Sequence, residues 1–222
     1  PQSTIKELIK NYNKGQFGYV LVKVKKLLTL FPKSTVLYNI EGSANDSLQN
    51  YQDAVSSYKK SIKIDKNCAE THFNLGNTFK NMNYFEEAID SYKKAIEIEP
   101  DDAEAFSNMG NAYYLKGDLG FAIEIYKRAI NLNPNLFISY NNIGEALQDK
   151  GELDAAIFNY KEALRINPDY AEAYKNMGNA FKKKEDLHKA VENYKLAIEA
   201  NPEYLEAYNN MGNSLIDLGE TD

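Results

Sequence analysis

A glycine recurs every 34 residues along this 222-residue chain, and no other feature limits its possible folds so strongly. A fixed period of this length is typical of one supersecondary unit copied along the chain, because a single copy cannot bury its apolar face. The members of the series are Gly42, Gly76, Gly110, Gly144, Gly178 and Gly212. With this glycine as position 8, the repeats are 1–34, 35–68, 69–102, 103–136, 137–170 and 171–204, followed by residues 205–222.

Each repeat is predicted to form two antiparallel helices, as residues 103–136 illustrate. Apolar residues from Phe106 to Tyr113 follow the i, i+3, i+4, i+7 spacing of one helical face. A turn is expected around Gly117, and a second amphipathic helix follows it. Prolines end the units, because proline cannot continue a helix. They stand at 100, 134, 168 and 202.

Small and large residues alternate at fixed positions within the repeats. We expect Gly110 and Ala122 to lie where the two helices cross, since their lack of bulk allows the backbones to approach. The tyrosine at position 24 is expected to fill the space beside the small Ala129-type positions. These tyrosines are Tyr58, Tyr92, Tyr126, Tyr160 and Tyr194.

Glycine at position 8, alanine at 20, tyrosine at 24, alanine at 27 and proline at 32 together resemble the tetratricopeptide repeat. The resemblance implies an all-α, right-handed superhelical solenoid of antiparallel helix pairs, with about six and a half repeats. In that family the first helix of each pair lines the concave surface. We treat 1–222 as a single array, with a degenerate N-terminal repeat at 1–34.

Residues 205–222 are expected to form a lone first helix. That helix is either a native cap or the start of a truncated repeat, and we favour the second interpretation. Residues 35–68 also depart from the pattern, because Glu41 and Asn45 fall on the face that is packed in other repeats.

The bulk composition argues against several classes of partner. The formal charge of −6 disfavours nucleic-acid binding and binding to an anionic membrane surface. No apolar run reaches the ~18–20 residues of a membrane span. The one cysteine, Cys68, gives no sign of an oxidising compartment, so we expect a cytoplasmic protein. The chain begins at Pro1 rather than methionine, which leaves room for a targeting segment before it.

No catalytic motif occurs in the sequence: it has no GxxxxGK[ST], GxSxG, HExxH or CxxC pattern. The two histidines, His72 and His188, lie more than three repeats apart, so they do not share a metal. His72 is expected to replace a core aromatic residue. Cys68 is expected in a turn between repeats, with no histidine to activate it. We therefore expect no enzyme activity, no metal and no cofactor.

Asparagine recurs on the predicted concave face, although it is a mediocre helix former. Its amide group could hold the backbone of an extended peptide, whatever the side chains of that peptide. The alternatives are that these amides only bond neighbouring helices, or persist from repeat duplication. This row of asparagines at positions 6 and 9, which we call the ladder, resembles the asparagine-lined groove of tetratricopeptide arrays attached to O-linked N-acetylglucosamine transferases. Position 6 holds Asn74, Asn108, Asn142, Asn176 and Asn210, and position 9 holds Asn77, Asn111, Glu145, Asn179 and Asn213.

A second binding mode of the family is the carboxylate clamp for the C-terminal tails of chaperones. Lys175, Asn179 and Asn210 match its first two parts, but its basic positions in the complete triplets carry acidic, apolar or amide residues. We therefore disfavour chaperone-tail binding. Phe73 and Ile138 occupy clamp positions beside Asn77, Asn108 and Asn142. They either seat an apolar side chain of a ligand or are tolerated variations.

The sequence thus predicts a protein-interaction scaffold that binds an extended peptide or a partner helix in the concave groove. Two alternatives stay open. The chain is the substrate-recruiting arm of a larger enzyme, such as a glycosyltransferase or sulfotransferase, or it self-associates through the unfinished C-terminal helix. The sequence does not identify the partner protein or peptide.

Overall fold

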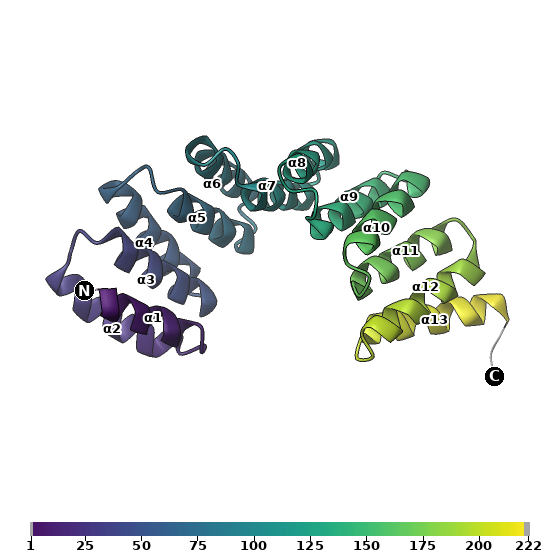
Figure 1. Ribbon diagram of the computed structural model, residues 1–222, viewed down its shortest axis with the longest axis horizontal. Coiled ribbons are helices and arrows are strands. Elements are labelled where there is room, and N and C mark those ends of the chain that lie inside the picture. Colours follow the sequence, from purple (N-terminus) through teal and green to yellow (C-terminus); the bar gives the residue numbers. More distant parts are fainter. Residues whose placement is uncertain (1, 220–222) are drawn as a thin grey trace. The chain divides into compact units, whose positions relative to one another are not determined.

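The computed structural model describes residues 2–219, and these form thirteen α-helices joined by short turns (Figure 1). The helices are α1 Gln2–Tyr12, α2 Phe17–Leu30, α3 Thr35–Ser47, α4 Tyr51–Ile64, α5 Ala69–Asn81, α6 Phe85–Ile98, α7 Ala103–Lys116, α8 Leu119–Leu132, α9 Phe137–Asp149, α10 Leu153–Ile166, α11 Ala171–Lys183, α12 Leu187–Ala200 and α13 Leu205–Leu218. The predicted all-α fold of successive helix pairs is confirmed.

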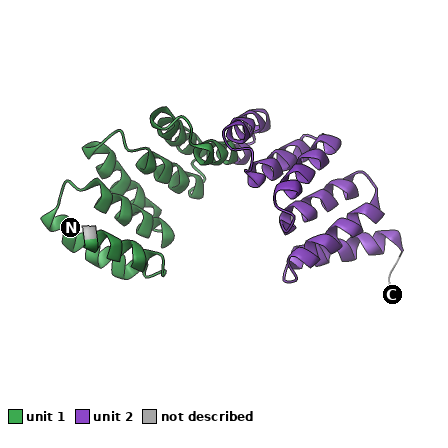
Figure 2. Cartoon of the chain, viewed as in Figure 1, with its two compact units in different colours: residues 1–112 green, residues 113–222 purple. Residues whose placement is uncertain are grey.

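The chain divides into two compact units, residues 1–112 and 113–222, with the boundary inside α7 (Figure 2). In unit 1, α3 packs against α4 and α5 against α6. In unit 2, α9 packs against α10 and α11 against α12. Each of these pairs is an antiparallel hairpin, and each unit stacks its hairpins in chain order.

The hairpins of each unit form two layers. The first helices contact one another, α1 with α3 and α3 with α5 in unit 1, and α9 with α11 and α11 with α13 in unit 2. The second helices pack against that layer from the other side. We call the outward side of the first helices the first-helix face and the outward side of the second helices the second-helix face.

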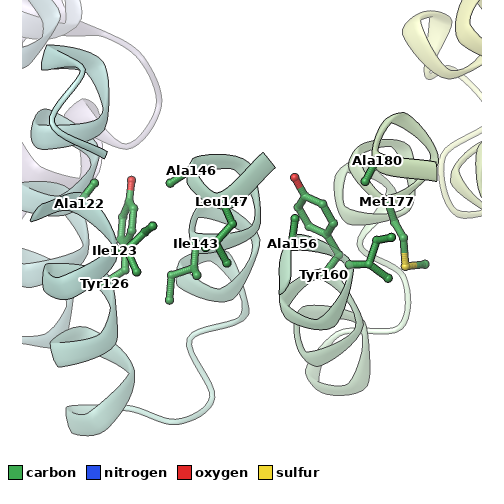
Figure 3. Close-up of a cluster of buried hydrophobic side chains, with 11 residues drawn as sticks. Ala122, Ile123, Tyr126, Ile143, Ala146, Leu147, Ala156, Tyr160, Met177 and Ala180 are labelled. Carbon is green, nitrogen blue, oxygen red and sulfur yellow. The ribbon is translucent and has the colours of Figure 1, made fainter. Parts of the chain in front are cut away.

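In four repeats the position-24 tyrosine lies against the position-8 glycine: Tyr58 against Gly42, Tyr92 against Gly76, Tyr160 against Gly144 and Tyr194 against Gly178. A Cβ atom added to Gly178 would come 2.6 Å from the Tyr194 ring, and one added to Gly42 would come 2.5 Å from the Tyr58 ring. Only glycine leaves room for the ring. Tyr126 and Tyr160 belong to a cluster of buried side chains in unit 2 that Ile143 and Leu147 also join (Figure 3).

Every hairpin turn contains a residue in the left-handed region, at position 15 of its repeat. Gly117 and Gly151 adopt φ of 92° and 81°, as a glycine does readily. Three repeats place a residue with a side chain there instead: Gln49, Asn83 and Glu185, with φ of 61°, 61° and 63°. The turn geometry is therefore kept even where glycine is absent.

The turns between hairpins are fixed by side chains that bond to the backbone two residues later. The Oδ1 atom of Asn133 accepts from the backbone N–H of Asn135 at 3.1 Å, and that of Asn201 accepts from Glu203 at 3.1 Å. Such turns free the following residue to begin the next helix. Proline follows both asparagines in the sequence, so helix extension is also blocked.

Repeat 35–68 buries polar side chains on its packed face. Glu41 and Asn45 are both buried, and the Ser57 hydroxyl donates to a Glu41 carboxylate oxygen at 2.9 Å. His72 is also buried, as predicted for a core position, with its Nε2 atom 3.0 Å from the Lys66 carbonyl oxygen. The buried Glu41 carboxylate and the His72 ring of the following repeat thus have polar partners within unit 1.

Candidate functional site

The predicted asparagine ladder lies on the first helices of both units. Unit 1 carries Asn74 and Asn77 on α5 and Asn108 and Asn111 on α7, and unit 2 carries Asn142 on α9, Asn176 and Asn179 on α11 and Asn210 on α13. All of these residues are partly buried except Asn176, which is buried. Their side chains therefore belong partly to the packing of the helices and partly to the first-helix face.

The position-9 amides are oriented by the position-24 tyrosines. In unit 1 the Tyr92 hydroxyl donates to Oδ1 of Asn77 at 2.6 Å, and in unit 2 the Tyr194 hydroxyl donates to Oδ1 of Asn179 at 2.8 Å. Burial raises the pKa of Tyr194 to about 12, so its hydroxyl remains a donor at neutral pH. Each carbonyl oxygen of the amide therefore turns toward the helix crossing, and each Nδ2 group turns away from the tyrosine.

The position-6 amides connect one repeat to the one before it. Nδ2 of Asn210 donates to Oδ1 of Asn179 at 3.1 Å. Nδ2 of Asn176 donates to Oδ1 of Asn141 at 3.1 Å and to a Glu145 carboxylate oxygen at 3.0 Å. Bonding between neighbouring helices, one of the three interpretations that the sequence left open, therefore accounts for part of the ladder.

Asn108 in unit 1 is bonded at both ends of its amide. Its Nδ2 group donates to the Glu104 carbonyl oxygen at 3.1 Å, and its Oδ1 atom accepts from the Lys80 ammonium at 3.2 Å. Burial lowers the pKa of Lys80, and the charge of Asp46 opposes that effect. Unit 1 thus presents a cation beside its ladder, held by an amide oxygen.

Glu145 replaces asparagine at position 9 of its repeat. Burial raises the pKa of this carboxyl group, the negative charge of Glu172 raises it further, and the hydrogen bond from Asn176 acts in the opposite direction. The ladder in unit 2 therefore contains one carboxylate that is costly to ionise where the other repeats carry a neutral amide.

Lys175, predicted to contact a ligand, is buried in the structure. Its ammonium lies 3.4 Å from a Glu206 carboxylate oxygen. Burial lowers the pKa of Lys175, but Tyr204 and Glu206 outweigh that effect and hold the pKa above its ordinary value. The charge of Lys175 is thus paired within unit 2.

The two predicted apolar contacts differ in exposure. Ile138 on α9 is exposed, with 47% of its surface accessible. Phe73 on α5 is partly buried, and its ring lies edge-on to the Tyr92 ring, with 5.9 Å between the centroids. Ile138 is therefore available to a ligand of unit 2, whereas Phe73 also supports the tyrosine that orients Asn77.

Sequence reasoning missed a cavity of 410 Å³ on the first-helix face of unit 1. Ile9 and Tyr12 from α1 and Val36 and Ile40 from α3 supply its apolar lining. Val36 and Ile40 stand at positions 2 and 6, where later repeats carry glutamate (except for Ile138) and asparagine, respectively. That substitution was a visible signal, but the contribution of α1 was hidden because the first repeat matches the pattern poorly.

Two other kinds of site are absent from the described part of the chain. Within residues 2–219, no three histidine, cysteine or acidic side chains lie close enough to hold a metal ion. No helix in the same range has the length and apolar character needed to cross a membrane.

The repeats of this chain match those of known proteins. A family model described as TPR repeat matches residues 42–83, 82–117, 110–151, 147–185 and 178–219. A crystal structure of MamA is 30% identical to this chain, over 74% of it and 96% of the MamA chain, with a TM-score of 0.67. No curated protein sequence gives a significant match.

Two further solved structures support the fold alone. YrrB, described as a TPR protein with an unusual peptide-binding site, is 23% identical over 84% of this chain and 96% of its own, with a TM-score of 0.64. PilF of Pseudomonas aeruginosa is 18% identical over 94% of this chain and 95% of its own, with a TM-score of 0.78.

Proposed function

This chain belongs to the tetratricopeptide repeat family, and we propose that it is a protein-interaction scaffold that holds an extended peptide against its first-helix face. The contacts would be made in each unit by the amides of the ladder. In unit 1 the central contact is Asn77, and in unit 2 it is Asn179. Ile138 would add an apolar contact in unit 2.

The observation that carries the proposal is the fixed direction of the position-9 amides. Oδ1 of Asn77 and Oδ1 of Asn179 each accept a tyrosine hydroxyl. Within residues 2–219, neither Nδ2 group donates to a protein atom. A primary amide offers two N–H donors, and a peptide carbonyl oxygen is the acceptor that an extended chain repeats along its length. The protein therefore presents donors whose orientation is set before a ligand arrives.

In this arrangement the protein would bond to the backbone of a ligand rather than to its side chains. A hydrogen bond to a peptide carbonyl is the same for almost every residue type, so the ladder supplies affinity without strong sequence preference. Selectivity would come from apolar contacts such as Ile138. The description of YrrB as a protein with an unusual peptide-binding site is consistent with peptide binding in a related fold.

The proposal is tested by substitutions that remove the Nδ2 donor of Asn77 or Asn179 but keep the side-chain oxygen that accepts the tyrosine hydroxyl. A displayed library of random peptides is selected on the wild-type protein, and the recovered peptides are measured against Asn77→Asp and Asn179→Asp. Aspartate retains an oxygen for the tyrosine hydroxyl but replaces the Nδ2 donor with a second oxygen. We expect binding at the substituted unit to weaken about tenfold or more, because a hydrogen bond is lost and two oxygen atoms then face each other.

The matched control is Asn131→Asp, which makes the same chemical change at an exposed position of α8. That variant should bind the recovered peptides as the wild type does. Equal affinity of the Asn77→Asp, Asn179→Asp and Asn131→Asp variants for every recovered peptide, with circular dichroism unchanged, would show that the ladder is a structural device only.

A further inference from the structure

The charge of the chain is strongly segregated along its length. Residues 1–66 hold eleven lysines and five acidic residues, a formal charge of +6, whereas residues 67–222 carry a formal charge of −12. The total of −6 therefore conceals a basic N-terminal region. Residues 1–66 therefore carry the charge that an anionic surface attracts.

Five of the eleven lysines in residues 1–66 form two exposed stripes on the second helices of unit 1. On α4, Lys59, Lys60 and Lys63 are exposed and lie within one stripe of the helix, since residues three and four apart share a face. On α2, Lys23 and Lys26 are exposed in the same way. Both helices pack against α3, so their outward stripes belong to the same layer. We call these five lysines, together with Val22 and Leu30, the basic face.

None of the five lysines is paired with a carboxylate in the described part of the chain. No carboxylate of residues 2–219 forms an ion pair with any of them, although the Lys23 ammonium lies 5.4 Å from the centroid of the Tyr19 ring and that of Lys60 lies 5.7 Å from the Tyr38 ring. By contrast, Lys182 in unit 2 is paired with Asp217 at 2.9 Å. The lysines of the basic face are therefore free of ion pairs within residues 2–219, although Glu7 of α1 lines a hollow together with Lys23 and Lys26.

Large apolar side chains stand among these lysines. Val22 has 71% of its surface exposed and Leu30 has 67%, and both lie on the same stripe of α2 as Lys23 and Lys26. A helix surface that mixes exposed apolar side chains with lysines is typical of segments that rest in a membrane interface. Nucleic-acid sites favour arginine for bidentate contacts to phosphate, and residues 1–66 contain no arginine.

We propose that the basic face docks on the anionic surface of a lipid bilayer. The lysines would supply electrostatic attraction to the lipid headgroups, and Val22 and Leu30 would enter the interface between headgroups and acyl chains. The acidic remainder of the chain is repelled by the same surface. This surface is separate from the ladder, which lies on the other layer.

The experiment measures sedimentation of the protein with vesicles of phosphatidylcholine containing one quarter phosphatidylglycerol, and with vesicles of phosphatidylcholine alone. We expect binding only to the anionic vesicles, with an affinity that falls as salt is added. Each lysine near such a surface contributes about fivefold in affinity. Reversal of three charges in Lys59→Glu/Lys60→Glu/Lys63→Glu should therefore reduce binding by about a hundredfold or more.

The control reverses three exposed lysines on second helices of unit 2, in Lys127→Glu/Lys161→Glu/Lys195→Glu. This variant changes the net charge by the same amount but leaves the basic face intact. It should therefore retain much more binding than the unit 1 variant. Val22→Ser/Leu30→Ser should weaken binding without altering its salt dependence. Absence of binding to anionic vesicles, or equal loss in the two lysine variants, would overturn the proposal. Binding to a DNA duplex but not to vesicles would also overturn it.

Discussion

Tyr194 places its ring against Gly178 and its hydroxyl 2.8 Å from Oδ1 of Asn179, so one side chain fills the helix crossing and also sets the direction of an amide. Tyr92 stands in the same relationship to Gly76 and Asn77 in unit 1, with 2.6 Å between its hydroxyl and Oδ1 of the amide. Core packing and the candidate binding surface are therefore joined through the position-24 tyrosine.

Filling the space at position 8 should destabilise the protein. In Gly178→Ala the new Cβ would come 2.6 Å from the buried ring of Tyr194, so the helices must separate, at a cost of about 1–3 kcal/mol in the free energy of unfolding. Gly212→Ala is the control, because a Cβ at Gly212 meets no atom within 4 Å. There the better helix propensity of alanine should stabilise the protein by about 0.5–1 kcal/mol. Urea unfolding of both variants measures the difference, and equal effects would contradict the packing described.

Removal of the tyrosine hydroxyl should affect both stability and binding. Tyr194→Phe keeps the ring against Gly178 but loses the hydrogen bond to Asn179, which should cost about 1 kcal/mol of the free energy of unfolding. The amide also loses one of the bonds that orient it, so recovered peptides should bind unit 2 more weakly. Tyr208→Phe, at an exposed position of α13, is the control and should change neither property. Calorimetry and peptide titration of the two variants provide the measurements.

The hairpin turns of three repeats should be improved by glycine. Glu185 has a φ of 63°, and a residue with a Cβ pays about 1 kcal/mol or more for the left-handed region. Glu185→Gly should therefore raise the free energy of unfolding by about 0.5–1 kcal/mol, after the greater flexibility of glycine in the unfolded chain is subtracted. Thermal unfolding followed by circular dichroism tests this, and a lower melting temperature for the variant would refute it.

Alkaline pH should unfold the protein through its buried tyrosines. Burial raises the pKa of Tyr194 from 10.0 to about 12, and burial also raises the pKa values of Tyr58, Tyr92, Tyr126 and Tyr160. Since the folded protein holds these protons more tightly than the unfolded chain, stability is present below pH 10 and is lost as pH rises from about 10 toward 12. Phenolate absorbance and circular dichroism should therefore change together. Ionisation of all tyrosines near pH 10 without loss of helix would be inconsistent with their burial.

The sequence predicted the parts of this protein that depend on periodicity. The 34-residue spacing identified the helix pairs, the turn at Gly117 and the burial of His72, because a repeated apolar pattern determines which side of a helix is packed. The sequence did not show that the position-24 tyrosines contact the position-8 glycines. Periodicity gives the face of a helix but not the neighbour in the next helix, so the contact with glycine was not foreseen.

The hydrogen bonds of the ladder could not be predicted from the sequence, because they join residues that come into contact only in the folded chain. Asn176 and Glu145 are 31 residues apart, and their 3.0 Å hydrogen bond arises only once two repeats are stacked. Lys175 was assigned to a ligand because its position matched a family motif, whereas the structure pairs it with Glu206 from α13, the first helix of the following repeat. The basic face shows the opposite situation: its charge was visible in the sequence but was averaged away in the net value.

The most direct test of the account is a nuclear magnetic resonance titration of the side-chain amide groups with a peptide recovered from the library. We expect the Nδ2 protons of Asn77 or Asn179 to shift downfield as they engage a peptide carbonyl, while the signals of Asn131 on α8 do not move. A peptide that binds tightly but leaves the amide signals of Asn77 and Asn179 unchanged would contradict the claim that these amides hold the ligand.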